Sequence, residues 1–217
     1  MTTAVISPSK STWLNESGVA LNYGGATILF IGATAGNARR RALLQFDTSS
    51  IPAGVTISSI LLTIPWSTAA ANAEASEICT QTDTDWVEGT GSGTLPSNSS
   101  TWGAKVDDGG GGGGDPGPPA YATWTDGVGG SFGAAGKVSF NLPTSTGSVN
   151  YELAGSAELK AMVAAGSLDI MLKNTAAAET NGVAGVAQFT VAGTQITVTY
   201  TNPNQRFPGS HTMLRVG

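Results

Sequence analysis

Residues Ala38–Trp66, ARRRALLQFDTSSIPAGVTISSILLTIPW, decide the fold of this chain. Apolar side chains recur there at every second position, at Ala42, Leu44 and Phe46 and again at Ile60, Leu62, Ile64 and Trp66. A period of two is typical of a half-buried β-strand. Pro52 and Gly54 mark a turn between the two runs. We therefore predict two strands that pair antiparallel and cover one side of a sandwich.

The rest of the chain carries the same kind of pattern. Short alternating runs separated by Gly, Pro and Asn predict about eight to ten strands in an all-β, two-sheet antiparallel jelly-roll sandwich. Ser156 as an N-cap and Gly166 just past the end predict one short helix between them. The turn at Gly193 predicts a hairpin between strands 186–191 and 195–200.

The length of 217 residues suits one domain, because β-sandwiches often run to about 200–250 residues undivided. We predict a single jelly-roll domain over residues 1–202. Residues 97–136, which contain the run GGGGGGDPGPP, have too few aliphatic side chains for a core. They are predicted to be a long loop excursion from the scaffold. Residues 203–217 are predicted to form an irregular C-terminal tail.

Composition argues against several classes of function. The net charge of −5 argues against nucleic-acid binding, which needs a basic patch for phosphates. No apolar run approaches the roughly 18 residues of a membrane span, so no membrane insertion is expected. The first residues have neither the basic nor the apolar part of a signal peptide. Cys79 is the one cysteine, so no intramolecular disulfide forms, and a buried inert thiol is expected.

No catalytic constellation emerges, and we predict that the protein is not an enzyme. The one histidine, His211, lies in the irregular tail, far from any expected nucleophile, and one Cys with one His cannot build a zinc site. Asp83, Asp85 and Glu88 lie close together in an acidic loop. A solvated turn is favoured there over a glycosidase carboxylate pair. A structural calcium ion at these three residues is the alternative, since Ca²⁺ takes six to eight oxygen ligands.

Aromatic residues are the best candidates for binding a ligand. Trp86, Trp102, Tyr121 and Trp124 lie in or beside the irregular region, and flat aromatic faces suit the C–H face of a sugar ring. Trp124 and Tyr121 are the favoured pair for such a platform. For Trp86 and Trp102 the favoured interpretation is that they anchor long loops to the sheet edge.

Five motifs along the chain form a recognisable set: Asn22-Tyr23-Gly24, Arg40–Asp47, Ile51–Ile57, Asp85–Gly89 with Thr101-Trp102, and Gln195–Tyr200. In this order they resemble the DNRLRE-domain family. The resemblance covers residues of about 10 to 202 and implies a jelly roll without enzymatic activity. Such domains are found beside polysaccharide-degrading enzymes, some as carbohydrate-binding modules, and on bacterial surface and phage proteins. Ser11-Thr12-Trp13 stands where the family usually has an aspartate, so no N-terminal metal ligand is carried over.

Two functions follow from the sequence. The favoured one is a non-catalytic structural or adhesive subunit of a large assembly, such as a phage decoration, head-fibre or tail protein on the virion surface. This hypothesis makes homo-oligomers and other virion subunits the partners. Its expected interface lies in the tail, at Phe207, His211, Met213 and Leu214. The alternative is an extracellular carbohydrate-binding module, excised from an exported polysaccharide-degrading enzyme, whose partner is a surface glycan.

Overall fold

The computed structural model describes residues 1–18, 21–34, 36, 38–93, 100–105, 123–127, 129–181 and 184–203. In these ranges the helices are the 3₁₀ turn η1 (Glu16–Gly18), α1 (Ala157–Ala165) and α2 (Ala176–Thr180). The strands are β1 (Thr2–Ile6), β2 (Lys10–Asn15), β3 (Ile28–Ala33), β4 (Arg39–Asp47), β5 (Thr56–Thr68), β6 (Ala75–Thr80), β7 (Val138–Asn141), β8 (Gly147–Glu152), β9 (Ser167–Asn174), β10 (Gly185–Thr190) and β11 (Gln195–Thr201).

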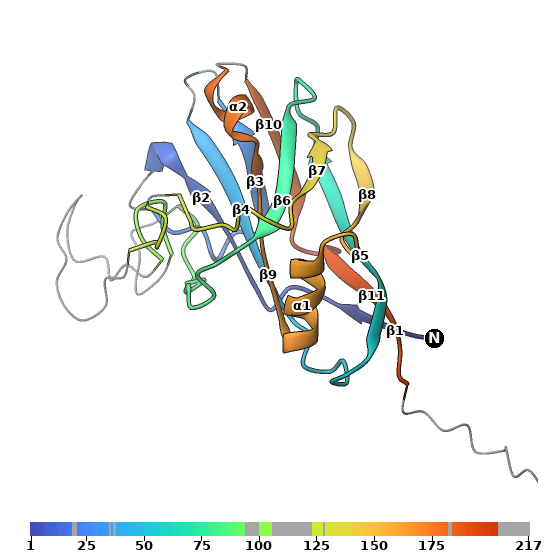
Figure 1. Ribbon diagram of the computed structural model, residues 1–217. Helices are drawn as coiled ribbons and strands as arrows, with labels where there is room; N and C mark the ends of the chain where they lie inside the picture. Colours follow the sequence, from blue (N-terminus) through green and yellow to red (C-terminus); the bar gives the residue numbers. More distant parts are fainter. Residues whose placement is uncertain are drawn as a thin grey trace, which may run out of the picture.

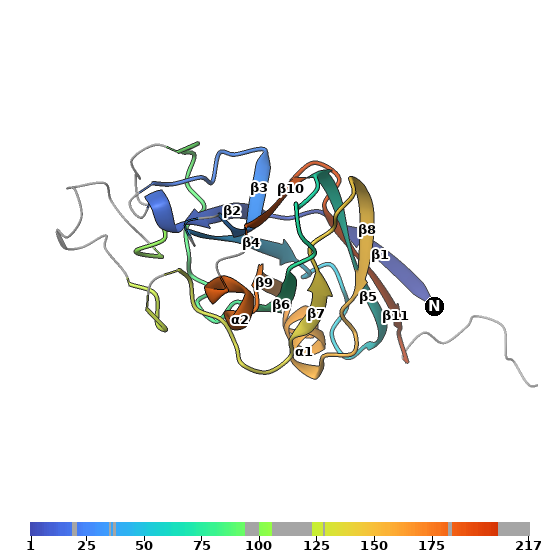
Figure 2. The ribbon, with the colours of Figure 1, turned by 90° about the horizontal axis from the view of Figure 1, so that it is seen from above.

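The strands form one continuous antiparallel sheet that curls into two layers (Figures 1 and 2). Their order is β1-β11-β5-β10-β3-β4-β9-β6-β7, with β2 paired to β4 and β8 paired to β5. One layer contains β5 and β11, and the other contains β4, β9 and β6. The all-β, jelly-roll-like class predicted from the sequence is confirmed.

The corner between the two layers lies at the end of β3. This strand pairs with β10 along its whole length, but with β4 only through Gly32 and Ala33. Gly32 has a φ of +117°, and a Cβ atom there would lie 1.8 Å from the carbonyl oxygen of Gly185. Only glycine allows this close approach and this backbone conformation. β2 pairs with the opposite edge of β4, because Arg40 pairs both with Asn15 of β2 and with Gly32 of β3.

The main core lies between the layers and is built by the predicted alternation. Ala42, Leu44 and Phe46 of β4 and Ile60, Leu62, Ile64 and Trp66 of β5 belong to one buried cluster. The predicted antiparallel pairing of these two strands is wrong. β4 pairs with β2, β3 and β9, whereas β5 pairs with β8, β10 and β11. Each strand has one apolar face, and placing the strands in opposite layers buries both faces against each other.

The predicted hairpin at Gly193 is also wrong. β10 and β11 both pair antiparallel with β5, β10 through Trp66 and Thr68 and β11 through residues 56–63. The two strands therefore follow one another along the same edge of β5. The turn between them, closed by a hydrogen bond from Thr194 N to Val191 O (3.0 Å), offsets the chain and does not reverse it.

The predicted helix is confirmed as α1. The Ser156 side chain accepts a hydrogen bond from Leu159 N, and Gly166 ends the helix with a φ of +99°. The second helix, α2, is an addition to the one helix that was predicted. It has five residues and an N-cap at Thr175, which is too short to give a helical period in the sequence. No helix in the described ranges is long and apolar enough to cross a membrane.

Candidate functional site

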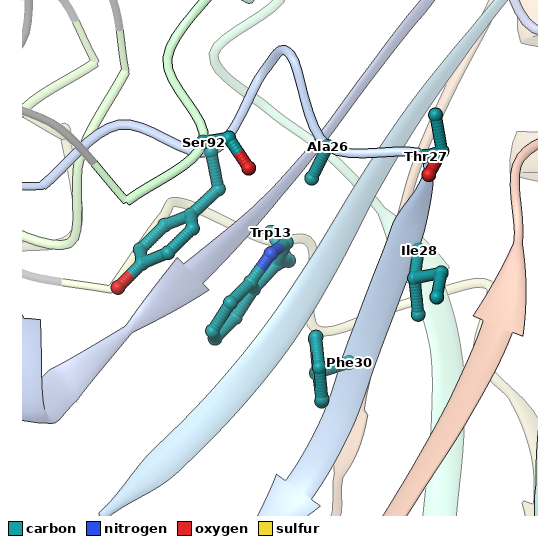
Figure 3. Close-up of a pocket in the computed structure, with 7 residues that line it drawn as sticks. Trp13, Ala26, Thr27, Ile28, Phe30 and Ser92 are labelled. Atoms are coloured by element: carbon teal, nitrogen blue, oxygen red, sulfur yellow. The ribbon is translucent and has the colours of Figure 1, made fainter.

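A hollow lined by aromatic side chains opens between β2 and β3 (Figure 3). We call it the aromatic hollow. Its volume is about 260 Å³, and it is lined by Trp13, Tyr23, Ala26, Thr27, Ile28, Phe30 and Ser92. Trp13 comes from β2, and Ile28 and Phe30 come from β3. β4 lies between these two strands, because Arg40 pairs with Asn15 of β2 and with Gly32 of β3.

Alternation along β3 supplies one wall of the aromatic hollow. Leu29 and Ile31 are fully buried in the main core. Successive side chains of a strand point to opposite faces, so Ile28 and Phe30 are turned the other way. Ile28 remains 37% exposed, which is unusual for an aliphatic residue in this chain.

Three rings pack together in the aromatic hollow. The Trp13 and Tyr23 ring centroids are 3.9 Å apart with an interplanar angle of 33°. The Trp13 and Phe30 centroids are 4.5 Å apart at 44°. Trp13 is buried between half-buried Tyr23 and Phe30. The rings thus form a continuous apolar surface held by mutual contact, of the kind that can pack against the apolar face of a ligand.

Arg40 lies against the same rings. Its guanidinium carbon is 5.6 Å from the Trp13 centroid and 5.1 Å from the Phe30 centroid, within the range of a cation–π contact. Burial lowers the pKa of Arg40. In the part of the chain that the structure describes, Arg40 has no carboxylate partner. The Nε atoms of Arg40 and Trp13 are also buried, and they have no acceptor among the described residues.

Asn22 fixes the loop that carries Ser92 into the aromatic hollow. Its side chain donates to the carbonyls of Glu88 (2.8 Å) and Ser100 (2.9 Å), and accepts from Gly91 N (2.8 Å). Asn22 is 1% exposed, so these hydrogen bonds are made away from water. The wall formed by Ser92 is therefore tied to the chain segment that also supplies Tyr23.

The tryptophans predicted to form a sugar platform lie in a second buried cluster. Trp86, Trp102 and Trp124 are 0%, 1% and 2% exposed. We call this cluster the outer core, formed by Leu14, Leu43, Cys79, Trp86, Trp102, Trp124 and Met171. Its strand residues point away from the main core, because Leu43 and its partner Met171 alternate with core residues.

Burial in the outer core agrees with loop anchoring, the interpretation favoured from the sequence for Trp86 and Trp102. Trp124 Nε1 donates to the Thr101 carbonyl (3.0 Å), and the guanidinium groups of Arg39 and Arg41 lie over the Trp102 ring. Their faces are covered and are not presented to a ligand. Tyr121, the other member of the predicted platform, lies outside the described residues.

A buried ion pair closes the outer core on the side of α2. Arg41 donates from Nε and Nη2 to the two carboxylate oxygens of Glu179, at 2.9 and 2.8 Å. Its third contact, from Nη1 to the Gly129 carbonyl (2.8 Å), holds the loop that returns toward β7. Cys79 is fully buried as predicted, and burial raises the pKa of its thiol to about 12. The thiol is therefore unreactive at neutral pH.

The three predicted calcium ligands do not converge. The carboxylate of Asp83 accepts from Thr125 and Ser131, that of Asp85 from Lys105, and that of Glu88 from the Ser11 backbone. Lys105 Nζ lies 2.9 Å from Asp85 and 3.6 Å from Asp83, whereas Glu88 is held by Ser11. Among the described residues, no group of three or more His, Cys, Asp and Glu side chains is placed to hold a metal ion.

The predicted interface residues of the tail, Phe207, His211, Met213 and Leu214, lie outside the described residues, as does most of the excursion 97–136. The aromatic hollow itself was not predicted. One signal for it was present in the sequence: Ile28 and Phe30 share the strand face opposite to Leu29 and Ile31. Trp13 was not recognised as its partner, because it lies on another strand.

Comparison with known proteins agrees with the position of the aromatic hollow. No curated protein matches the chain. The family model of carbohydrate-binding module family 96 matches residues 2–96, somewhat less than half of the chain. All residues that line the aromatic hollow lie within the matched range. The N-terminal part of this jelly roll is thus similar to a carbohydrate-binding module.

Proposed function

We propose that this protein is a non-catalytic carbohydrate-binding protein, and that the aromatic hollow is its binding site. One observation carries the proposal. An open hollow built from Trp13, Tyr23 and Phe30 lies inside the segment that matches a carbohydrate-binding module family. The similarity of residues 2–96 to the module family suggests the class of ligand, and the aromatic hollow suggests where that ligand binds.

The chemistry of the hollow suits a sugar ring. A pyranose has an apolar C–H face, which packs on aromatic rings, and a polar edge of hydroxyl groups. Ile28 extends the apolar surface toward solvent. Thr27 and Ser92, which also line the hollow and are exposed, supply hydroxyl groups for hydrogen bonds to the ligand. Specific sugar sites are built in this way, with a mostly apolar lining and a few polar groups that fix orientation.

The setting of this activity remains a choice between the two hypotheses drawn from the sequence. In an assembly such as a virion, the module would display the aromatic hollow at the surface of many copies. In an exported enzyme, it would hold a catalytic domain on its polysaccharide. The molar mass in solution separates the two, because an assembly subunit self-associates and an isolated module remains a monomer. Light scattering on the full chain measures that mass.

Binding to a panel of neutral and charged polysaccharides tests the proposal. We expect Tyr23→Ala and Phe30→Ala each to weaken binding about tenfold, or 1.4 kcal/mol. Tyr151→Ala is the matched control, since this half-buried tyrosine lies on β8, away from the aromatic hollow. Affinity electrophoresis finds the ligand, and isothermal titration calorimetry measures the variants. Unchanged binding in both variants would rule out the aromatic hollow, and no binding across the panel would rule out the function.

A further inference from the structure

A second hollow lies on the outer face of the sheet, beside the end of α1. We call it the polar hollow. Its volume is about 370 Å³, and it is lined by Gln45, Thr84, Met162, Ala165, Ser167 and Asp169. Gln45 of β4 and Asp169 of β9 are partners in the sheet register. Met162 and Ala165 come from α1, and Thr84 comes from the loop after β6.

Asp169 organises the polar groups of this hollow. It is fully buried, yet in the described part of the chain it has no cationic partner. Its carboxylate accepts hydrogen bonds from Gln45 Nε2 (2.5 Å) and from Ser167 Oγ (2.6 Å). An ionised carboxylate only accepts hydrogen bonds. Gln45 must therefore direct its NH₂ group, and Ser167 its O–H group, at Asp169.

This arrangement leaves Gln45 and Ser167 with acceptor atoms for the hollow. The amide oxygen of Gln45 has no hydrogen-bond partner among the described residues, and the Ser167 O–H already donates a hydrogen bond to Asp169, which leaves its oxygen lone pairs as acceptors. Both side chains are only half-buried, so solvent reaches them. Next to these acceptors, Met162 and Ala165 form an apolar wall. A ligand for the polar hollow must then offer adjacent hydrogen-bond donors beside an apolar face.

We propose that the polar hollow is a second saccharide-binding site, in which adjacent ring hydroxyls donate to Gln45 Oε1 and Ser167 Oγ. The inference rests on the proposed carbohydrate-binding function for the class of ligand, but uses a different set of residues. Asp169 is a positioning residue, because it lies behind the two side chains and orients them. Hydroxyl donors fit this site better than a metal ion, for which one enclosed carboxylate supplies too few ligands.

The test titrates the full chain with methyl glycosides of glucose, galactose and mannose. Each glycoside is paired with derivatives in which one ring hydroxyl is replaced by fluorine, which conserves size but cannot donate. We expect the NMR signals of the Gln45 side-chain amide and of the Ser167 backbone to shift on binding. Fluorine at either donating hydroxyl, or Ser167→Ala, should weaken this response about tenfold. Ser49→Ala, at an exposed serine outside the lining, is the matched control.

Asp169→Asn tests the orientation directly. The new NH₂ group faces either Gln45 or Ser167 and donates to it, so that side chain turns a donor toward the hollow. The variant should then lose the preference for hydroxyl over fluorine, while its spectrum remains that of a folded protein. If Asp169 only stabilised the fold and did not orient Gln45, the substitution would leave that preference unchanged.

The outcomes separate this site from the aromatic hollow. Tyr23→Ala should leave the Gln45 response intact, even if polysaccharide binding is lost. The inference is overturned if no glycoside shifts the Gln45 amide, if fluorinated and parent sugars bind equally, or if Tyr23→Ala removes the response. If the aromatic hollow fails its own test while Gln45 still responds, the polar hollow alone binds sugar.

Discussion

Single side chains attach the irregular segments of this protein to its sheet, and Asp83 is the clearest case. Its carboxylate accepts from Thr125 N (2.8 Å), from Thr125 Oγ1 (2.6 Å) and from Ser131 Oγ (2.6 Å). Burial by itself would raise the pKa of Asp83, but the hydrogen bonds from Ser131 and Thr125 outweigh it and the pKa is lowered. The charged form is therefore part of the folded structure.

Replacing Asp83 should destabilise the protein in a pH-dependent way. We expect Asp83→Asn to lower the free energy of unfolding at neutral pH by about 1–3 kcal/mol, because an amide cannot accept all three hydrogen bonds. Since the folded-state pKa is lowered, the contribution is present above the unfolded pKa of about 3.9 and is lost as pH falls through the folded value. Wild type and variant should therefore converge in acid, as measured by urea unfolding across pH.

Asp85→Asn is the control for this experiment. The Asp85 side chain is 67% exposed and pairs with Lys105 at 2.9 Å. Exposed ion pairs contribute about 0–1 kcal/mol. A loss for Asp85→Asn as large as that for Asp83→Asn would contradict the role assigned to the buried carboxylate.

At the scale of elements, the sequence predicts an element correctly when the contacts that form it join residues close together in the chain. The helix α1 was predicted with both ends, because its N-cap at Ser156 and its left-handed Gly166 act within a few residues. The partners of β4 and β5 were predicted wrongly, since partner choice depends on strands more than a hundred residues away. β4 pairs with β9 over six residues, and β5 pairs with β11 over seven.

The cap of α1 offers a test at this scale. Ser156→Ala removes the acceptor for Leu159 N and should cost about 1 kcal/mol of stability. Ser145→Ala, at an exposed serine in the loop before β8, should cost almost nothing. Thermal unfolding of the two variants makes the comparison. Equal midpoints would show that the cap contributes nothing to the stability of the folded chain.

At the scale of the whole molecule, two apolar cores share one layer of the sheet. The inner face of β4 and β9 packs in the main core, and the outer face packs under residues of the long excursion in the outer core. Tryptophans that looked available for a ligand are buried as a result. The aromatic hollow, the proposed binding site, lies instead where β2 and β3 flank β4.

This arrangement predicts the behaviour of all the tryptophans together. Each of the five is at most 6% exposed, including Trp13 in the aromatic hollow. Acrylamide should therefore quench the fluorescence of the folded protein far less than that of the protein unfolded in guanidinium. Strong quenching in the folded state would show that the tryptophans of the excursion are exposed, as the platform hypothesis requires.

The sequence by itself determined the fold class, the alternation that builds the main core, the caps of α1 and the buried state of Cys79. These properties depend on short-range periods and on single-residue conformational preferences. Only the tertiary structure decided which strands pair, which aromatic rings are buried and where a ligand can enter. Trp13, Phe30 and Ser92 come from three separate segments, and β4 lies between the strands that carry Trp13 and Phe30. A hollow is a property of the distance between segments, and no local pattern records that distance.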